Sequence, residues 1–597
     1  MDAPRTPNTT RPRKGRSVSA SASPDKTEDF DVVVVGSGFG ASVIAYRLAK
    51  EGQRVCVLER GRPYPPGSFP RDPRGMAANL WDPATGLHGL FDVWAFRGIE
   101  SVVSSGLGGG SLIYANVLIR KPERWFVNEA LPGRKGYERW PIDRDLLEPH
   151  YDAVEKMLDA QPYPFDVAPY DQTPKTIAMR DAAKMLGLEW ELPKLAVSFR
   201  SPGQDPTPGV PLHEERPNYH NLPRQTCRLC GECDAGCNYG AKNTLDYTYL
   251  SRAKDYKAEI HTLSEVRSIE PVDGPGGGTS GYRVTYVTHQ PSDDQTPVPL
   301  SQLRTTTVKA RRVVLGAGTF GTTYLLLRNR SAMPRLSAAL GTRFSGNGDL
   351  LTAIVKARQW VGGQHVPRHL DPSTGPVITS VIPVADSHDG TGAPGRGFYV
   401  EDGGNPAFLD WVAESAGALS LAGRTAAFLA RRVIAHLRGD PRSHISSDIS
   451  KLLGGGRVSA NAMPVLTMGR DIPDGVMRLR NGDLDVSWNT QSSKAYFDRV
   501  QQTLGSIALA LDGELLNPLL QLFKRVITVH PLGGAPMARN DREGVINADG
   551  EAFHYPGLYV VDGAAMPGPV GPNPSLTIAA FADHVADGIV SAAKGAP

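Results

Sequence analysis

The sequence predicts an α/β protein in which a Rossmann-type domain is interleaved with a second, α+β domain. Three observations support this fold class. An apolar run at residues 31–35 leads into a glycine-rich turn and a helix-like segment. Similar strand-and-glycine units recur at 312–318 and 557–563. A chain of 597 residues is also too long for one ordinary domain.

The composition is that of a globular protein and excludes some functions. A formal net charge of +3 is close to neutral for this length, so nothing indicates binding to nucleic acid. No stretch of eighteen or more residues is purely apolar, so no membrane-spanning segment is expected. Residues 1–28 are rich in Ser, Thr, Pro and basic residues, which predicts a disordered basic tail. That tail lacks a secretory pattern, so we expect a cytoplasmic protein.

The first strand of the predicted sheet ends in a turn suited to a dinucleotide. Val32–Val35 is continuously apolar, as expected for a strand buried on both faces of a parallel sheet. Gly36 permits the tight turn, Gly38 lets the backbone approach a pyrophosphate, and Ala41 allows close packing of the following helix. A second strand at 54–58 delivers Glu59 where a carboxylate that binds the ribose belongs. The alternative is a glycine-rich turn with a solvated Glu59.

A second glycine-rich segment lies at 106–110 and contains Gly108, Gly109 and Gly110. So many glycines suit close contact between the backbone and a ligand, although a flexible loop is the alternative. Asn116 follows it.

Two polar residues stand out near the carboxy terminus. His530 follows a predicted strand at 526–529 and precedes a proline, which favours an extended backbone at the histidine. Asn573 and Pro574 open an apolar helix, where Asn is a good N-cap and Pro is favoured at the first helical position. Each residue alone has a structural alternative: a buried histidine without a catalytic role, and a plain helix cap.

Four of the five cysteines occupy one short run with the spacing C-x2-C-x2-C-x3-C, namely Cys227, Cys230, Cys233 and Cys237. This is the ligand spacing of bacterial ferredoxins. In ferredoxins the fourth cysteine of this run binds another cluster, and the only remaining cysteine here, Cys56, belongs to the predicted strand at 54–58. Three interpretations stay open: an iron–sulfur cluster, a structural zinc, or cysteines without a metal.

Taken together, these motifs resemble the glucose–methanol–choline (GMC) flavoprotein oxidoreductases. Within that family the chain is most similar to the cholesterol oxidases and their actinobacterial relatives. The segments that carry the resemblance are GSGFGASVIAYRL at 36–48, GLGGGSLIYAN at 106–116, LGAGTFGTTYLLL at 315–327, HPLGG at 530–534 and VDGAAMPGPVGPNPSLTIAA at 561–580.

The resemblance implies bound FAD and names the residues that would hold it. These are Gly36, Gly38, Phe39, Gly40, Glu59, Gly108, Gly109, Gly110, Asn116, Val266, Asp562, Gly563, Asn573, Pro574 and Thr577. It also implies that His530 and Asn573 are catalytic, and that some relatives carry an iron–sulfur cluster near the cysteine run.

Two positions depart from the family pattern. Cholesterol oxidases have Asn directly after the glycine-rich segment, where this chain has Tyr114, and Asn116 comes two residues later. They also use an active-site Glu in the substrate domain, for which Glu401 is only a weak candidate.

The resemblance implies an FAD domain formed by 29–125, 226–345 and 526–597, and a substrate domain formed by 126–225 and 346–525. Residues 406–437 predict an amphipathic helix; core packing is one interpretation, and peripheral membrane contact that delivers a lipid is the other.

The expected activity is removal of a hydride from the CH–OH group of a bulky hydrophobic alcohol, most of all a sterol, with O2 or another external electron acceptor. Ketosteroid desaturation or isomerisation, oxidation of another lipid or sugar alcohol, and a catalytically silent electron carrier are the alternatives.

Overall fold

The fold is described here from a computed structural model. The structure describes residues 29–129, 137–275, 277, 280–292, 294–386, 396–404, 462–516 and 526–594. The predicted amphipathic helix at 406–437 and the predicted tail at 1–28 therefore lie outside the described residues.

A mixed sheet lies at the centre of one half of the folded molecule, and its strands come from both ends of the sequence. Its order is β12-β2-β1-β15-β14-β13, and β26 also pairs with β15. β2, β1, β15, β26 and β12 run parallel, whereas β14 and β13 form an antiparallel extension. The strands are β1 (Asp29–Val35), β2 (Val55–Leu58), β12 (Glu259–His261), β13 (Ser264–Pro271), β14 (Tyr282–Thr288), β15 (Arg304–Leu315) and β26 (Leu558–Val560).

Helices cover this sheet and share its apolar core. α1 (Phe39–Lys50) packs against α12 (Pro574–Lys594), and α12 packs against α3 (Arg144–Met157). α12 is long and apolar enough to cross a membrane, but 56% of its apolar window is buried inside the protein, as in a core helix. α3 belongs to the stretch 126–225 that we predicted for the substrate domain, yet its buried face contributes to the same core as the mixed sheet.

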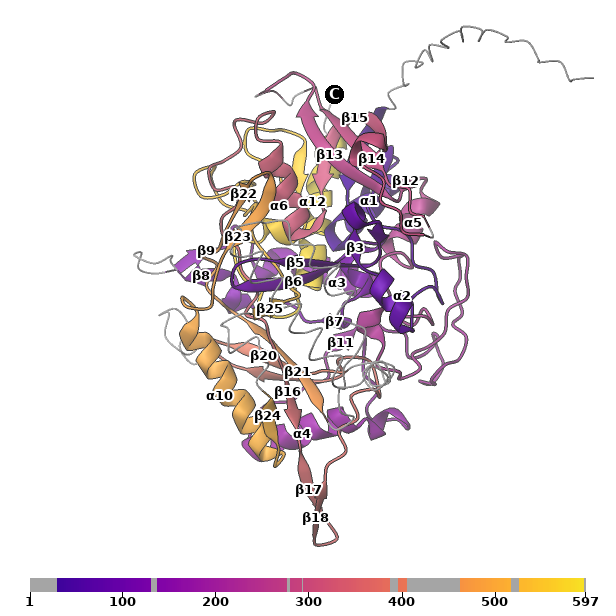
Figure 1. Ribbon diagram of the computed structural model, residues 1–597, viewed down its shortest axis with the longest axis vertical. Helices are drawn as coiled ribbons and strands as arrows, with labels where there is room; N and C mark the ends of the chain where they lie inside the picture. Colours follow the sequence, from indigo (N-terminus) through magenta and orange to yellow (C-terminus); the bar gives the residue numbers. More distant parts are fainter. Residues whose placement is uncertain are drawn as a thin grey trace, which may run out of the picture.

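A five-stranded antiparallel sheet forms the other half, with the order β19-β20-β21-β16-β24. Figure 1 shows the two sheets toward opposite ends of the long axis, with the hairpin β17–β18 projecting beyond the second one. α4 (Pro174–Leu186) and α10 (Lys494–Ala510) pack on this second sheet. Its strands are β16 (Leu350–Val355), β19 (Val381–Val384), β20 (Phe398–Asp402), β21 (Met463–Gly469) and β24 (Glu514–Leu516); the hairpin is β17 (Arg358–Val361) with β18 (Gln364–Pro367).

A small sheet lies between the two large ones in Figure 1. In it β25 (Val526–Thr528) runs parallel to β6 (Ile99–Ser104), which pairs with β5 (Phe91–Ala95). Because β25 ends two residues before His530, this sheet fixes where the predicted catalytic histidine emerges. The predicted domain boundaries themselves stay a prediction.

Candidate active site

The first glycine-rich turn lies against the backbone of two other glycine-rich segments, at Gly316 and at Gly109. Gly36 has a left-handed φ of 91°, and a Cβ there would lie 2.4 Å from the Gly316 carbonyl oxygen. Gly109, with φ 53°, would place a Cβ 2.7 Å from the Cα of Gly38. Only residues without a side chain allow these segments to approach so closely.

Two glycines of these segments, Gly38 and Gly110, leave open space beside the backbone. A Cβ on Gly110 would meet no described atom within 4 Å, and one on Gly38 would find only the Gly316 oxygen at 3.8 Å. α1 begins at Phe39, and the side-chain-free Gly38 at its N-cap leaves the first N–H groups of the helix without a side-chain acceptor. Such an N-terminus is suited to bind the pyrophosphate of a dinucleotide.

Glu59 lies at the end of β2 and is buried. Its carboxyl group accepts hydrogen bonds from the Ser37 hydroxyl at 2.6 Å and from the Gly61 N–H at 2.8 Å. Burial raises its pKa. The Ser37 oxygen in turn accepts the Gly108 N–H at 2.9 Å, which links Glu59 to the second glycine-rich segment.

Val266 lies in β13 close to the same strand end. Its side chain is buried, and the Ser264 N–H that begins β13 donates to the Glu59 carbonyl oxygen at 2.8 Å. The structure therefore brings Val266, which the resemblance places at the cofactor, near the predicted ribose contact Glu59.

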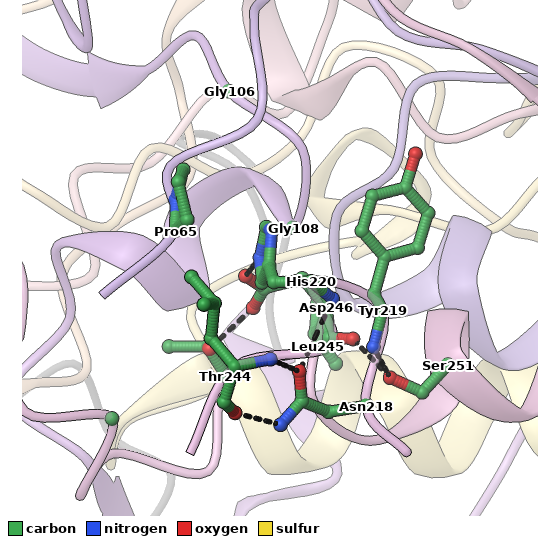
Figure 2. Close-up of polar contacts among 12 residues, drawn as sticks. Pro65, Gly106, Gly108, Asn218, Tyr219, His220, Thr244, Leu245, Asp246 and Ser251 are labelled. Atoms are coloured by element: carbon green, nitrogen blue, oxygen red, sulfur yellow. Dashed lines mark hydrogen bonds and ion pairs between the residues drawn. The ribbon is translucent and has the colours of Figure 1, made fainter. Parts of the chain in front are cut away.

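A polar cluster that we did not predict supports the second glycine-rich segment (Figure 2). His220 Nε2 lies 2.7 Å from a carboxylate oxygen of Asp246, and the Ser251 hydroxyl donates to the Asp246 carbonyl at 2.5 Å. The neighbouring Leu245 N–H donates to Ser111 Oγ at 3.1 Å. Leu245 and Asp246 belong to the stretch NTLDYTYL at 243–250, but the residue spacing in that stretch does not predict the cluster.

Asn116 supplies polar atoms that the described protein does not satisfy. It is fully buried with φ 72°, and neither Oδ1 nor Nδ2 has a partner among the described residues. The Tyr114 hydroxyl is also buried without such a partner. Buried polar groups normally find hydrogen bonds, so these atoms fit a bound polar ligand.

His530 is held by a buried carboxylate that sequence reasoning missed. His530 Nδ1 lies 2.9 Å from Asp349 Oδ1, and its backbone N–H donates to Asp349 Oδ2 at 3.1 Å. The Asp349 side chain is fully buried, whereas that of His530 is 16% exposed. The two residues are 181 positions apart, and no local pattern connects them.

Asn573 meets Glu401, the weak sequence candidate, on β20. Asn573 Nδ2 donates to Glu401 Oε2 at 3.4 Å, while Oδ1 of Asn573 and Oε1 of Glu401 have no partner within the described chain. Asn573 therefore does not cap α12 with its side-chain oxygen, contrary to the structural alternative. Burial, with nearby Asp402 and Asp349, raises the pKa of Glu401 to about 8.

The remaining predicted residues border the start of α12 or the preceding turn. Asp562 accepts the Ala564 N–H at 2.9 Å, and burial raises its pKa to about 6. Gly563 and Pro574 are buried, and the Thr577 hydroxyl lies 3.0 Å from that of Tyr151.

The cysteine run does not form a metal site in the structure. Cys227, Cys230, Cys233 and Cys237 line one cavity of about 20 Å³. Within the described residues no group of three or more His, Cys, Asp or Glu side chains is arranged to hold a metal ion, and these cysteines form no disulfide there. Cys227 and Cys233 instead pack in an apolar cluster, so the iron–sulfur prediction gains no support.

Comparison with known proteins settles the family. Residues 490–582 match the family model described as GMC oxidoreductase, and residues 34–66 match an NAD(P)-binding Rossmann-like domain. A cholesterol oxidase of Mycobacterium tuberculosis is 30% identical over 94% of this chain and 90% of its own length. The chain belongs to the GMC oxidoreductase family.

Other relatives of this GMC protein are more distant. A cholesterol oxidase of Acinetobacter baumannii is 26% identical over 93% of each chain. A long-chain-alcohol oxidase of Arabidopsis thaliana is 22% identical over 95% of this chain and 67% of its own. A fungal aryl-alcohol oxidase shares the fold, with a TM-score of 0.55 at 15% identity, covering 95% of this chain and 100% of that one.

The GMC protein is an FAD-dependent alcohol oxidase, and its residues fit that cofactor. Gly38 and Gly110 leave open space beside the backbone, and the start of α1 has no side-chain cap. The buried polar atoms of Asn116 have no partner among the described residues. A large polar ligand such as FAD would satisfy these groups. When bound, FAD supplies the hydride acceptor.

Proposed function

We propose that this GMC oxidase removes a hydride from the CH–OH group of a bulky hydrophobic alcohol, most of all a sterol. The observation that carries the proposal is the contact between Asn573 and the buried Glu401, because the cholesterol oxidases that the chain resembles use an active-site Glu in the substrate domain. Similarity to two cholesterol oxidases over nearly the whole chain supports the same substrate class.

The roles follow from the geometry. The Nδ1 contact with Asp349 leaves Nε2 of His530 as the acceptor for the substrate hydroxyl proton. Asn573, whose Oδ1 has no described partner, would orient the same hydroxyl oxygen or contact the cofactor. Loss of a hydroxyl proton to a positioned base promotes loss of the carbinol hydrogen as hydride.

Glu401 supports a second activity, ketosteroid isomerisation. A carboxyl with a pKa of about 8 is close to the ideal for exchanging a proton near neutral pH. Movement of a carbon–carbon double bond in the oxidised product requires removal of one proton and its return at another carbon, which one carboxyl can perform. We assign this step to Glu401 rather than to His530.

We further propose O2 as the electron acceptor, since the relatives named above are oxidases. The test offers the FAD-loaded enzyme a 3β-hydroxysterol, a long-chain primary alcohol and an aryl alcohol under air. Product and hydrogen peroxide should form at equal rates, fastest with the sterol. A preference for either other alcohol would overturn the assignment of a sterol as substrate. Turnover only with an added electron-accepting dye would overturn the assignment of O2 as electron acceptor.

A further inference from the structure

The two proposed catalytic side chains come from separate parts of the chain and share one support. His530 follows β25, and Asn573 precedes α12. The segment 345–349, placed just before β16, contacts both: Asp349 reaches His530, and Asn347 reaches the residues before Asn573.

The Asp349 carboxylate accepts hydrogen bonds from the backbone that leads into His530 and contacts the histidine ring. Its Oδ2 accepts the Val529 N–H at 2.9 Å and the His530 N–H at 3.1 Å, and lies 2.9 Å from the Thr528 hydroxyl. Its Oδ1 faces His530 Nδ1 at 2.9 Å. A carboxylate only accepts, so this contact places the ring proton on Nδ1 and leaves the Nε2 lone pair free.

Asn347 fixes the other partner through the backbone. Its Oδ1 accepts the Gly571 N–H at 2.9 Å, and its Nδ2 lies 3.3 Å from the carbonyl oxygens of Gly571 and Pro572. Asn347 is fully buried and has a left-handed φ of 54°. The next residue in the chain after these contacts is Asn573.

The segment is itself anchored from behind. Asp471, which follows β21, accepts the Ser345 hydroxyl at 2.5 Å and the Gly346 N–H at 3.0 Å. At Gly348, with φ 65°, a Cβ would lie 2.5 Å from the Tyr496 hydroxyl oxygen, so a larger residue would push the segment away. These contacts tie the segment to the second sheet.

We propose that Asp349 and Asn347 are positioning residues, which set the tautomer of His530 and the placement of Asn573 from one segment. The inference rests on the proposed roles of His530 and Asn573. Its consequence is that the His530 base stays aligned with Asn573 even though the two belong to different segments.

Asp349→Asn tests the first half. The variant should keep FAD, and flavin reduction by alcohol in anaerobic stopped flow should slow by about 10- to 100-fold, as with other groups that orient a functional histidine. Loss of the carboxylate also removes stabilisation of the protonated ring, so the acidic limb of the rate profile should move to lower pH. Glu401 and Asp471 are the other acids near this site, and Asp349 raises the pKa of both, so the shift of the limb should also be present when Asp349→Asn is combined with Glu401→Gln.

Asp583→Asn is the matched control. Asp583 makes a comparable buried contact with His150, Oδ2 to Nδ1 at 2.8 Å, on α12 and α3. It should lower the melting temperature and leave the pH profile of reduction as in the unmodified enzyme. An equal shift of that profile in both variants, or none in Asp349→Asn, would overturn the role of Asp349.

A measurement on the unmodified enzyme avoids dependence on folding of the variant. In 15N spectra, the His530 signals, identified by their loss in His530→Ala, should report a neutral ring protonated at Nδ1. Protonation at Nε2 instead would refute the tautomer assignment. If His530→Ala itself reduces flavin at the normal rate, the proposed function fails, which is a different result.

Asn347→Ala tests the second half. Reduction should slow without movement of the pH limb, and the effect should not add to that of Asn573→Ala in the double variant, because both changes disturb one group. Full additivity would show that Asn347 does not act through Asn573.

Discussion

His530 is the residue whose loss should separate chemistry from cofactor binding. It contacts Asp349 and lies outside the glycine turns, so His530→Ala should keep FAD while flavin reduction by alcohol falls by about 10²- to 10⁴-fold. Anaerobic stopped-flow reduction isolates this step, and the FAD-to-protein ratio is the control. Reduction at the rate of the unmodified enzyme would exclude His530 as the base.

Glu401 should make the protein less stable as pH rises. Its folded pKa of about 8 lies above the unfolded value, so between about pH 4.5 and 8 the unfolded chain has lost a proton that the folded chain keeps. The free energy of unfolding therefore falls across that window, by on the order of 2–5 kcal/mol. Glu401→Gln has no such proton, and its melting temperature should drop less than that of the unmodified enzyme between pH 5 and pH 8. Equal drops would mean that Glu401 ionises normally.

At the scale of elements, two glycines of the nucleotide turns should respond differently to Ala. A Cβ on Gly40 would lie 1.8 Å from the Val561 carbonyl oxygen, so Gly40→Ala should lower stability by about 1–3 kcal/mol or more. A Cβ on Gly110 meets no described atom within 4 Å, so Gly110→Ala should fold normally but hold FAD more weakly. Thermal melts and flavin absorbance distinguish the two. Normal FAD retention in Gly110→Ala would show that its open side does not face the cofactor.

The cysteine segment should behave as packed, metal-free thiols. Burial raises the pKa of Cys227 and Cys233, which makes their thiolates scarce and their reaction with a disulfide reagent slow in the folded protein. All thiols should react in denaturant. After anaerobic purification, iron and acid-labile sulfide should both be far below one per chain; three or more of each would restore the cluster prediction.

For the whole molecule, FAD should stabilise three distant segments together. The turns at 36–41 and 106–116 meet at Gly38 and Gly109, and α12 packs on α1, so FAD held by all three segments would stabilise them in the folded state. Hydrogen exchange with and without FAD should show protection in each, together with a higher melting temperature. Protection confined to residues 34–66 would contradict this shared site.

More of the cofactor site than of the substrate site could be predicted from the sequence. The strand, turn and helix around Gly36, and the acid at Glu59, are encoded within one short stretch, so the sequence shows them directly. The prediction for the cysteine run used spacing alone, and spacing does not report that the side chains pack in an apolar cluster around a cavity of about 20 Å³.

By itself the sequence determined the strand, glycine turn and helix around Gly36 and the apolar helix at the carboxy terminus, because each depends on neighbours within a few residues. The candidate pair His530 and Asn573 came from the resemblance to the family and stays a prediction. Only the tertiary structure decided that Glu401 meets Asn573 across 172 positions and that Asp349 meets His530 across 181. Those contacts depend on how the second sheet and the small β5–β6–β25 sheet are placed against α12, and no local periodicity specifies that placement.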